Sequence, residues 1–409
     1  MGPSAYVALI VVLVGALIGA PGLLFAGLLI GLVLALRSVW SRYGLRALEY
    51  ERHVSAHRVL WGERIDLDLV VRNGKPLPLP WLRIDDTVTH GAEIVGRELT
   101  PSSQRGFDVL REIWSIGWFE RVTRHLQIVG TRRGTYRFIS AELRVADLFA
   151  STQRIEERPI TTSYRVVPRI VTVRSAFTDS VVGSVKATKG LYEEPSLFAG
   201  VRPYEPGDQL RRIHWKATAR LGVPVSRRFD PAREREVLIA VDMQTMPGLS
   251  WMLNWDDDLV EGLCIAALSL ARAFVGDGVA AGLAVNAFSD RPQRTVFVPP
   301  SAAAGQLAAI ADLLADVSPY ASVPFERLLA DVARRAPHGC SVVALSSRDP
   351  LEFVPTLRRL RAQGFAVTAA AFGPDAGVWS AHARSLGVPS AGYRLDPDWQ
   401  TADALERVA

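Results

Sequence analysis

An uncharged stretch runs from Ala5 to Leu36, 32 residues without a Lys, Arg, Asp or Glu. A single helix of that length would measure about 48 Å, whereas the hydrocarbon layer of a bilayer is roughly 30 Å thick. Pro21-Gly22 stands at the middle of the stretch and favours a break there. We therefore expect a transmembrane helical hairpin over residues 1–40. One long kinked helix with its N-terminus outside the cell is the alternative.

Basic residues follow the uncharged run and indicate its orientation. Arg37, Arg42, Arg46 and Arg52 come next in the chain, and such residues flank membrane spans on the cytoplasmic side. Trp40 can lie at the membrane interface beside them. No basic segment precedes the run, so a cleaved signal peptide is not expected. The sequence predicts a multi-pass protein of the cell membrane with two spans, main domains in the cytoplasm and the lipid bilayer as a partner.

Residues 41–150 contain short runs in which apolar and polar side chains alternate. From Ile65 to Val71 every second residue is apolar, and Asn73-Gly74 then signals a turn. The alternation returns at Trp81–Ile84 and again between residues 126 and 138. This pattern predicts an antiparallel β-sandwich-like domain. Residues 151–236 are expected to form a connector that contains one strand, Tyr164–Val167.

The rhythm changes after residue 236, where strand-like and helix-like segments alternate. Val237–Val241 is a continuous apolar run, typical of a strand buried on both faces. Further strands are expected at 280–288, 341–345 and 365–371, and helices at 256–275, 303–317, 325–335 and 351–361. This alternation predicts that residues 237–409 form an α/β domain with a parallel, doubly wound sheet and helices on both faces.

A charged segment precedes the α/β domain. Between Gly200 and Glu236 there are nine Lys and Arg residues against five Asp and Glu, most of the chain's net charge of +5. Pro206-Gly207 marks a turn, and the Asp208 side chain can accept from the next backbone amides. So many arginines beside Tyr204 and Trp215 indicate either recognition of an acidic partner or an internal ion-pair network.

The spacing of special residues in this segment resembles the signature of the domain of unknown function 58 family. The matching residues are Phe198, Gly200, Arg202, Tyr204, Gly207, Asp208, Arg211, Ile213, Trp215, Ala219 and Arg220. The resemblance implies a membrane-anchored protein with two spans, whose α/β domain is von Willebrand factor A-like. It also implies a partner, because family members are commonly associated with MoxR-type ATPases of the AAA+ class.

In von Willebrand A-like domains a metal often lies at the carboxyl edge of the sheet, held by an Asp-x-Ser-x-Ser loop. Here the loop begins with Asp242, but Gln244 and Met246 replace the two hydroxyl residues. A hard cation requires several oxygen ligands, and methionine supplies none. Ser347 stands where an aspartate often lies, and Arg348 brings a positive charge close. We expect a degenerate site without metal or other cofactor, in which Asp242 holds its loop or pairs with an arginine.

Motifs for enzyme chemistry are absent from the sequence. It contains no phosphate-binding Gly-rich loop with Lys-Ser/Thr, no HExxH and no GxSxG. Asp208 and His214 could form an acid–base pair, but their spacing alone gives this pair little support. Cys264 and Cys340 stand far apart in apolar stretches and are expected to be buried, reduced thiols. We therefore predict that the protein is not an enzyme.

The sequence as a whole predicts a membrane-anchored adaptor or scaffold that works with a MoxR-type ATPase on a membrane or envelope client. Two alternatives are a membrane-surface protein whose basic segment binds anionic lipid or nucleic acid, and a metal-dependent hydrolase. Nucleic acid is the less expected partner, since basic charge alone does not indicate it. The expected partner-binding residues are Arg211, Arg212, Arg227 and Arg228. The remaining signature residues are assigned structural roles: Phe198, Gly200, Arg202, Tyr204, Gly207, Asp208, Ile213, Trp215 and Arg220.

Overall fold

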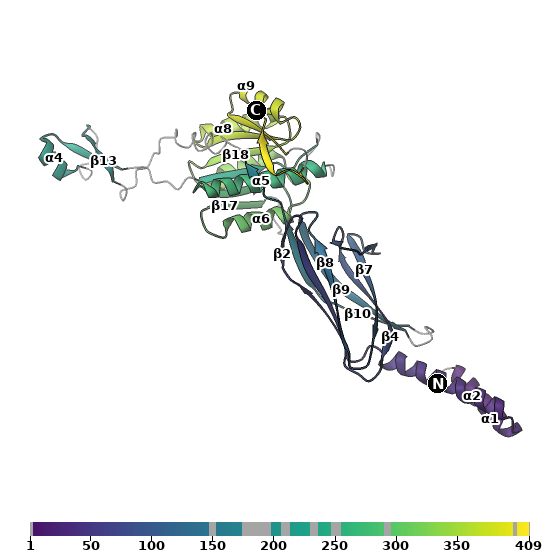
Figure 1. Cartoon of the computed structure of the whole chain (residues 1–409). Helices are drawn as coiled ribbons and strands as arrows, with labels where there is room; N and C mark the ends of the chain where they lie inside the picture. The colour runs from purple at the N-terminus through teal and green to yellow at the C-terminus, as the bar shows by residue number, and fades with distance from the viewer. Residues whose placement is uncertain are drawn as a thin grey trace. The chain divides into compact units, whose positions relative to one another are not determined.

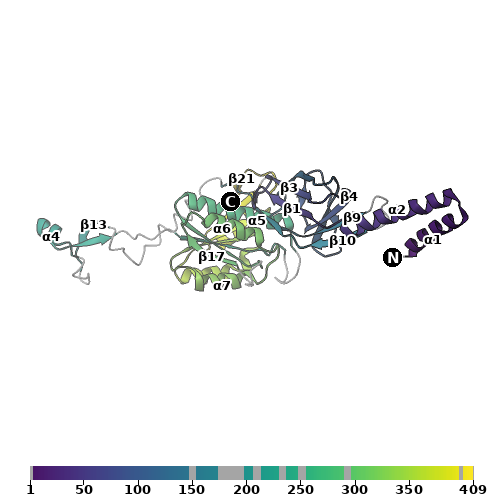
Figure 2. The same cartoon turned by 90° about the horizontal axis from the view of Figure 1, so that it is seen from below.

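The computed structural model describes residues 3–146, 153–173, 198–205, 213–229, 236–246, 255–289, 296–395 and 399–408. The chain divides into two compact units, Met1–Val167 and Pro168–Ala409. The first unit contains two helices and a β domain, and the second contains an α/β domain (Figure 1 and Figure 2).

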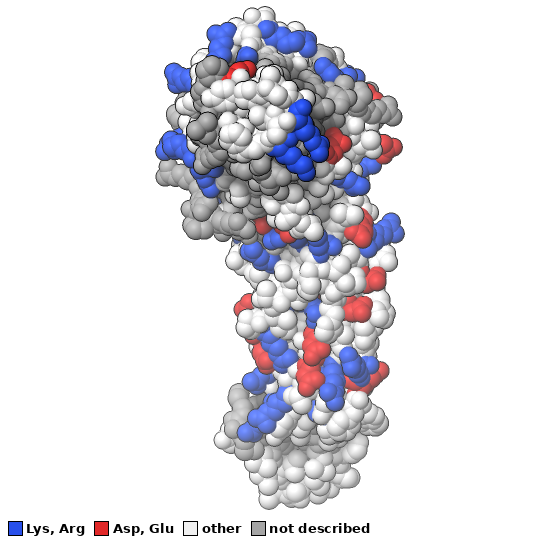
Figure 3. Space-filling model, turned by 90° about the vertical axis from the view of Figure 1, so that its left-hand side faces the viewer, with Lys and Arg blue, Asp and Glu red and all other residues white. Residues whose placement is uncertain are grey.

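The N-terminal helices are α1 (Pro3–Ile18) and α2 (Pro21–Tyr43), separated by a turn in which Gly19 has a φ of +68°. They pack closely because glycines lie between them: a Cβ on Gly27 would lie 2.6 Å from Cγ2 of Val12. The described part of the hairpin carries no charge before Arg37, as its white surface in Figure 3 shows. Two apolar helices are therefore present in place of one long helix.

Burial, and not length or composition alone, distinguishes these helices from the rest. Helix α2 is long and apolar enough to cross a membrane, whereas the apolar part of α1, Tyr6–Ile18, is shorter. Helix α5 (Asp257–Gly276) passes the same test, but most of it is buried in the core of the α/β domain. Helices α1 and α2, in contrast, expose most of their large apolar side chains.

Two sheets form the β domain. The first has the strand order β1-β3-β8-β5, and the second has the order β2-β11-β9-β4-β7-β6, with β10 also paired to β9. Neighbouring strands are antiparallel, except that β11 runs parallel to β2. The bounds are β1 Leu48–Val54, β2 Arg58–Leu60, β3 Arg64–Asn73, β4 Leu79–Thr89, β5 Glu93–Ile94, β6 Thr100–Pro101, β7 Phe107–Ile116, β8 Arg121–Val129, β9 Gly134–Ala146, β10 Gln153–Arg158 and β11 Thr162–Val167.

Both sheets contribute to one hydrophobic core. The alternation predicted in β3 buries Ile65, Leu67, Leu69 and Val71 in the same cluster as Phe138 of β9. The start of the expected connector belongs to this domain, since it supplies β10 and β11. The predicted strand at Tyr164–Val167 is present within β11.

The core of the β domain contains an ion pair. Nη1 of Arg52 lies 2.7 Å from Oδ1 of Asp86, and the two side chains are 0% and 1% exposed. The Tyr50 hydroxyl donates to the other oxygen of Asp86, and Arg52 also donates to the Ile160 carbonyl. Burial raises the pKa of Asp86 to about 6, although Arg52 opposes this shift.

The α/β domain is built on an eight-stranded sheet with the order β12-β21-β20-β19-β18-β15-β16-β17. Its five central strands, β20 to β16 in that order, are mutually parallel, whereas β17 and β21 run antiparallel to their neighbours β16 and β20. The bounds are β12 Thr172–Val173, β15 Glu236–Val241, β16 Ala280–Val285, β17 Val296–Ser301, β18 Ser341–Ser346, β19 Ala366–Phe372, β20 Ser390–Leu395 and β21 Ala404–Arg407.

The expectation of a wholly parallel sheet is corrected to a mixed one. Strands β17 and β21 follow their antiparallel neighbours after short links, residues 286–295 and 396–403. A parallel crossover needs a dozen or more residues, commonly a helix, so these links favour antiparallel return. The sequence prediction did not identify either strand.

Helices cover both faces of the sheet (Figure 2). Leu238 and Ala240 of β15 pack in one cluster with Phe325 of α7 and Leu357 of α8. Because side chains alternate along a strand, Val237, Ile239 and Val241 point to the opposite face, where α5 packs. The helix bounds are α5 Asp257–Gly276, α6 Gln306–Asp316, α7 Phe325–Arg335, α8 Val354–Ala362 and α9 Ala376–Ser385.

Candidate functional site

The candidate site lies at the carboxyl edge of the sheet, beside the central strand β15. Open α/β sheets bind ligands at such an edge, where strand order reverses. Asp242 directly follows β15, Asn286 directly follows β16, and Ser346 is the last residue of β18. All three side chains are buried, because three parallel strands end at the same level and bring them together.

Both oxygens of the Asp242 carboxylate are fully engaged. Oδ1 accepts from Nδ2 of Asn286 at 2.9 Å and from the backbone amide of Gln244 at 3.1 Å. Oδ2 accepts from the Ser346 hydroxyl at 3.1 Å. It also accepts from Nε of Arg348 at 2.9 Å and lies 2.8 Å from Nη2 of the same guanidinium. Five donors from four residues therefore saturate the carboxylate.

Arg348 supplies the positive charge at this site. Its Nη1 donates to Oε2 of Glu352 at 2.6 Å, so the guanidinium bridges two carboxylates. Glu352 ends η2 (Pro350–Glu352), a 3₁₀ turn that Asp349 caps by accepting from the Leu351 amide. Burial opposes protonation of Arg348, but the carboxylates of Asp242, Glu352 and Glu326 together outweigh burial and raise the pKa of the guanidinium. The cation at the sheet edge is therefore a permanent part of the fold.

A second layer of hydrogen bonds fixes the loop after β15. Oδ1 of Asn286 accepts from the Met243 amide at 2.8 Å, and its Nδ2 also donates to the Val323 carbonyl at 3.1 Å. The Gln244 side chain donates to the Met246 carbonyl, so it is turned back onto its own loop. This arrangement rigidifies the loop through side-chain amides and backbone groups.

A divalent cation does not fit the arrangement. Arg348 lies against the carboxylate oxygen that would have to coordinate it, and displacing the guanidinium would leave a buried positive charge unpaired. Within the described residues no group of three or more His, Cys, Asp and Glu could hold a metal. The interpretation of Asp242 as a residue that pairs with an arginine and ties down its loop agrees with this geometry.

Asn286, Ser346 and Glu352 complete the site, and the sequence analysis did not identify them. Asn286 and Ser346 carry a recognisable signal, since each is a polar residue at the carboxyl end of a parallel strand beside β15. Glu352 follows Arg348 by four residues, a spacing that allows an ion pair on a helical turn. Ser347, expected near a metal position, has a buried hydroxyl with no hydrogen-bond partner among the described residues.

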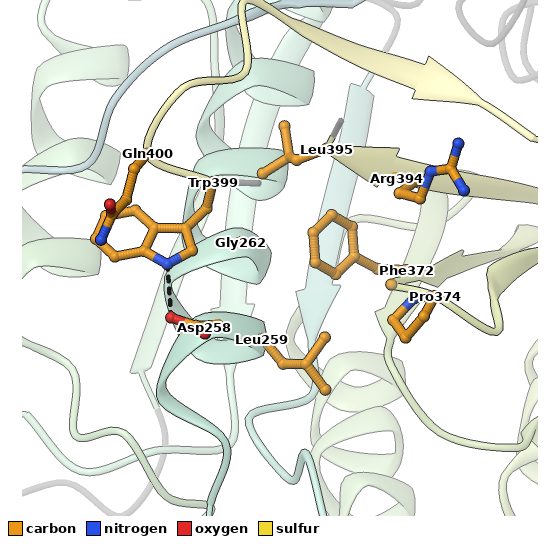
Figure 4. Close-up of a pocket in the computed structure, with 10 residues that line it drawn as sticks. Asp258, Leu259, Gly262, Phe372, Pro374, Arg394, Leu395, Trp399 and Gln400 are labelled. Carbon is orange, nitrogen blue, oxygen red and sulfur yellow. Dashed lines mark hydrogen bonds between the residues drawn. The ribbon is translucent and has the colours of Figure 1, made fainter. Parts of the chain in front are cut away.

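A separate hollow opens at the same edge of the sheet, with a volume of about 370 Å³. It is lined by the first turns of α5 and the ends of β19 and β20 (Figure 4). Nε1 of Trp399 donates to Oδ1 of Asp258 at 2.8 Å, which fixes the indole on one wall, and Phe372 lies on another. Among the described residues that line it there is no Ser, Cys, His or Lys. Its described lining offers apolar surface with one acidic and one basic side chain, Asp258 and Arg394.

The signature segment forms a hairpin of β13 (Phe198–Pro203) and β14 (Val225–Phe229), with helix α4 (Trp215–Leu221) between them; we call this the arm. The register places Arg227 opposite Val201 and Arg228 opposite Gly200. Gly207, Asp208, Arg211 and Arg212 lie outside the described residues.

The other signature residues occupy different environments in the arm. Ile213 is buried and forms a bridge with Ser226, and Nη1 of Arg202 lies 3.5 Å from Oε2 of Glu205. Trp215 is 65% exposed at the start of α4, so it does not fill the edge of a core within the described arm. Arg220 is exposed in the last turn, and Tyr204 is half-buried. The roles assigned to the signature residues stay predictions.

His214 has a structural task at the start of α4. It is the N-cap residue, and its Nδ1 accepts from the Ala217 amide at 3.1 Å. A ring nitrogen that accepts from a backbone amide is not available to take a proton from a substrate. This contact leaves the weakly supported acid–base role of His214 without structural support.

Comparison with known proteins gives one family match and one relative. The model of a family described as "Protein of unknown function DUF58" matches residues 200–361. "Uncharacterized protein YeaD" of Bacillus subtilis (strain 168) is 23% identical over 270 residues, which cover 64% of this chain and 59% of the relative. The match thus spans less than two thirds of that relative's length. The resemblance stated from the signature residues is confirmed at the level of this family.

Two solved structures to which the chain is similar show how weak such similarities are. A CARDB domain of the PF1109 protein from Pyrococcus furiosus has a TM-score of 0.20 and 16% identity, and covers 29% of this chain and 91% of that chain. A non-cellulosomal cohesin from Archaeoglobus fulgidus has a TM-score of 0.20 and 9% identity over the same shares of the two chains. Similarities of this strength assign neither fold nor function.

Proposed function

This chain carries a DUF58-family region at residues 200–361, and we propose that it is a membrane-anchored adaptor that acts through protein contacts and not through catalysis. The observation that carries the proposal is the ion pair between Asp242 and Arg348, in which Nη2 of Arg348 lies 2.8 Å from Oδ2 of Asp242. At the sheet edge where α/β domains hold ligands, the protein places its own cation against its own buried carboxylate. Chemistry at that carboxylate would require breaking the pair.

We further infer that the α/β domain is von Willebrand A-like, as the family resemblance implies. The central position of β15 between β16 and β18, the helices on both faces and the aspartate directly after β15 support this assignment. In this interpretation Arg348 replaces the metal of the related sites, so the surface above it is available to a protein partner without a bridging ion.

The N-terminal hairpin is proposed to anchor the chain in the cell membrane, with both ends on the cytoplasmic side. The apolar surfaces of α1 and α2 and the basic residues that begin at Arg37 support this orientation. Reporters fused before Met1 and after Ala409 should both behave as cytoplasmic. A reporter before Met1 that reads as external would refute the hairpin topology.

The proposed partner is an AAA+ ATPase of the MoxR type, bound through Arg211, Arg212, Arg227 and Arg228. The high density of arginine in the arm supports recognition of an acidic protein surface, because guanidinium groups pair with carboxylates in a bidentate geometry. The client and the activity of the complete protein depend on this partner, and both belong to the same proposal.

A pull-down from solubilised membranes tests the partner. The full-length chain should capture an AAA+ ATPase that mass spectrometry identifies, and the variant Arg211→Ala with Arg212→Ala should lose it while keeping its melting temperature. The matched control is Arg359→Ala with Arg384→Ala, which removes two exposed arginines from the α/β domain. Capture at the wild-type level by the arm variant would contradict the assignment. Binding to anionic vesicles or nucleic acid that falls steeply with salt and needs no ATPase would favour the alternative.

A further inference from the structure

The turn between β7 and β8, residues 117–120, exposes two large aromatic side chains. Trp118 is 70% exposed and Phe119 is 68% exposed. Phe119 has a φ of +50°, in the left-handed region that residues other than glycine rarely adopt. A strained backbone persists where the surrounding structure holds it, and here it points two aromatic rings away from the core.

This aromatic turn lies at the end of the β domain where α2 enters. Nε1 of Trp40, in the last turns of α2, donates to the Pro78 carbonyl at 3.0 Å. Pro78 precedes Leu79, and the register pairs Leu79 with Ile116, the last residue of β7 before the turn. Trp118 is therefore two residues beyond Ile116, whose strand partner Leu79 follows the residue that contacts α2.

Further hydrogen bonds fix the aromatic turn to the turn between β3 and β4, which bears the α2 contact. Nδ2 of Asn73 donates to the Leu77 carbonyl at 2.9 Å and to the Gly117 carbonyl at 2.7 Å. The Phe119 amide donates to the Lys75 carbonyl at 3.2 Å. Because Asn73 is buried and its amide group is shared between the two turns, neither can move without the other.

The surroundings of the aromatic turn match the composition of a membrane interface. Exposed basic residues on neighbouring segments are Arg42, Arg46, Arg121 and Arg154, and Nη1 of Arg154 donates to the Ser41 carbonyl of α2 at 3.2 Å. Tyr43, also exposed, ends α2. Trp and Tyr are enriched at the level of the lipid headgroups, and basic side chains there attract anionic lipids. Figure 3 shows the uncharged hairpin surface giving way to charged side chains at this end of the β domain.

We propose that Trp118 and Phe119 enter the headgroup layer of the membrane face at which α2 ends. The β domain then has a second, aromatic contact with the bilayer in addition to its covalent link to α2. Two contacts restrict rotation of the domain about the axis of α2, so they fix which of its faces the membrane leaves accessible. This inference rests on the proposed membrane anchoring of the hairpin, which its test examines separately.

The test uses the full-length chain in vesicles of phosphatidylcholine and phosphatidylglycerol, with a bimane label on one introduced cysteine at a time. The native Cys264 and Cys340 are buried and leave the label on the introduced site. The probe positions are Trp118→Cys for the aromatic turn, Leu29→Cys for the middle of α2 and Leu60→Cys for the opposite end of the β domain. Lipids with a nitroxide in the headgroup region or deep in the acyl chain then act as quenchers.

We expect the headgroup nitroxide to quench the probe at position 118 severalfold more than the probe at position 60, and the deep nitroxide to quench the probe at position 29. Phe119→Cys provides a second position in the turn if Trp118→Cys disturbs folding. Quenching at position 29 without quenching at 118 or 119 would overturn this inference and leave the anchoring intact. Absence of quenching at position 29 would overturn the anchoring itself.

Two other outcomes also contradict the inference. Equal quenching at positions 60 and 118 would indicate general adsorption of the β domain to the vesicle. Protection of position 118 from a water-soluble quencher, without quenching by lipid, would indicate that a protein or a second copy of the chain covers the turn.

Discussion

Two buried Arg–Asp pairs, one in each unit of the chain, differ in how many donors their carboxylates accept. Asp86 in the β domain accepts from Arg52 and Tyr50, and Arg52 leaves its buried Nε without a hydrogen-bond partner among the described residues. Asp242 in the α/β domain accepts from Arg348, Asn286, Ser346 and a backbone amide. Asp86 thus has only two donating residues, so the loss of either leaves its carboxylate poorly satisfied. Asp242 has four, so the loss of one leaves three in place.

The difference follows from the position of each pair in its sheet. Asp86 lies within β4, where neighbouring backbone groups are committed to the sheet and only side chains can satisfy it. Asp242 directly follows β15, where the chain leaves the sheet and the amide of Gln244 becomes available as a donor. At the end of a strand, protein groups can therefore supply all the hydrogen bonds that a buried carboxylate needs. Ligand sites of α/β domains form at the same ends of the strands.

The largest expected effect is the loss of Arg52. Arg52→Met leaves the Asp86 carboxylate in the core with Tyr50 as its remaining donor, and we expect a loss of about 3–5 kcal/mol in the free energy of unfolding of the β domain. Hydrogen exchange in peptides from β3 and β8 during a urea titration measures this domain separately. The control Arg72→Met removes an exposed arginine paired with Glu49 at 3.5 Å and should stay within about 0.5 kcal/mol. Equal effects of the two variants would refute the distinction.

The pH dependence of the Asp86 pair provides the second test. Burial raises the pKa of Asp86 to about 6, so the folded domain binds this proton more tightly than the unfolded chain. The contribution of this group to stability is complete below the unfolded pKa of about 4 and is lost as pH rises through about 6. In Arg52→Met the pKa should rise further, because Arg52 lowers it in the native protein. The destabilisation by Arg52→Met should therefore be larger at pH 8 than at pH 5; the opposite trend would contradict the assignment.

Loss of Arg348 should cost less than loss of Arg52. In Arg348→Met the Asp242 carboxylate retains Asn286, Ser346 and the Gln244 amide as donors. We therefore expect a loss of about 2–3 kcal/mol in the free energy of unfolding of the α/β domain, measured by hydrogen exchange in β15 and β18.

The native protein should also keep its melting temperature in Mg²⁺ or EDTA, since a cation does not fit beside Arg348. Tight, stoichiometric Mg²⁺ binding to the native protein by calorimetry, abolished by Asp242→Ala, would refute that interpretation.

The two pairs also differ in how far the sequence predicted them. Pairing of Asp242 with an arginine was foreseen, because Asp242 and Arg348 follow two apolar runs recognisable as parallel strands. The Arg52–Asp86 pair was not foreseen, since Arg52 was interpreted only as a basic flank of the membrane segment. Its signal was nevertheless present: Leu48, Tyr50 and Arg52 share the inward face of β1. Partner identity could not be predicted, because the pairing of distant strands decides which inward residues meet.

The same reasoning explains which parts of the fold were predicted. The strands at β15, β18 and β19 and the helix α7 follow from local apolar periodicity and were located within one or two residues. Strands β17, at one edge of the sheet, and β21, next to the other edge strand β12, were missed, because each carries a weaker apolar pattern than the central strands. The arm residues assigned to partner binding lie where the sequence is rich in charge and poor in periodicity. Local sequence patterns therefore could not predict their secondary structure or their neighbours.

The smallest expected effects come from removing one hydroxyl from each pair. Tyr50→Phe takes one of two donating residues from Asp86, and we expect a loss of about 2 kcal/mol. The hydroxyl is a dependable donor because burial raises the pKa of Tyr50 well above its usual range. Ser346→Ala takes one of five donors from Asp242, so about 1 kcal/mol is expected, measured by exchange in the unit concerned. If Ser346→Ala destabilises its domain more than Tyr50→Phe does, donor number does not determine how each carboxylate is supported. The closed edge of the α/β sheet would then depend on the Ser346 hydroxyl itself, which also accepts from the Arg348 amide at 3.2 Å and so orients the loop that carries the cation.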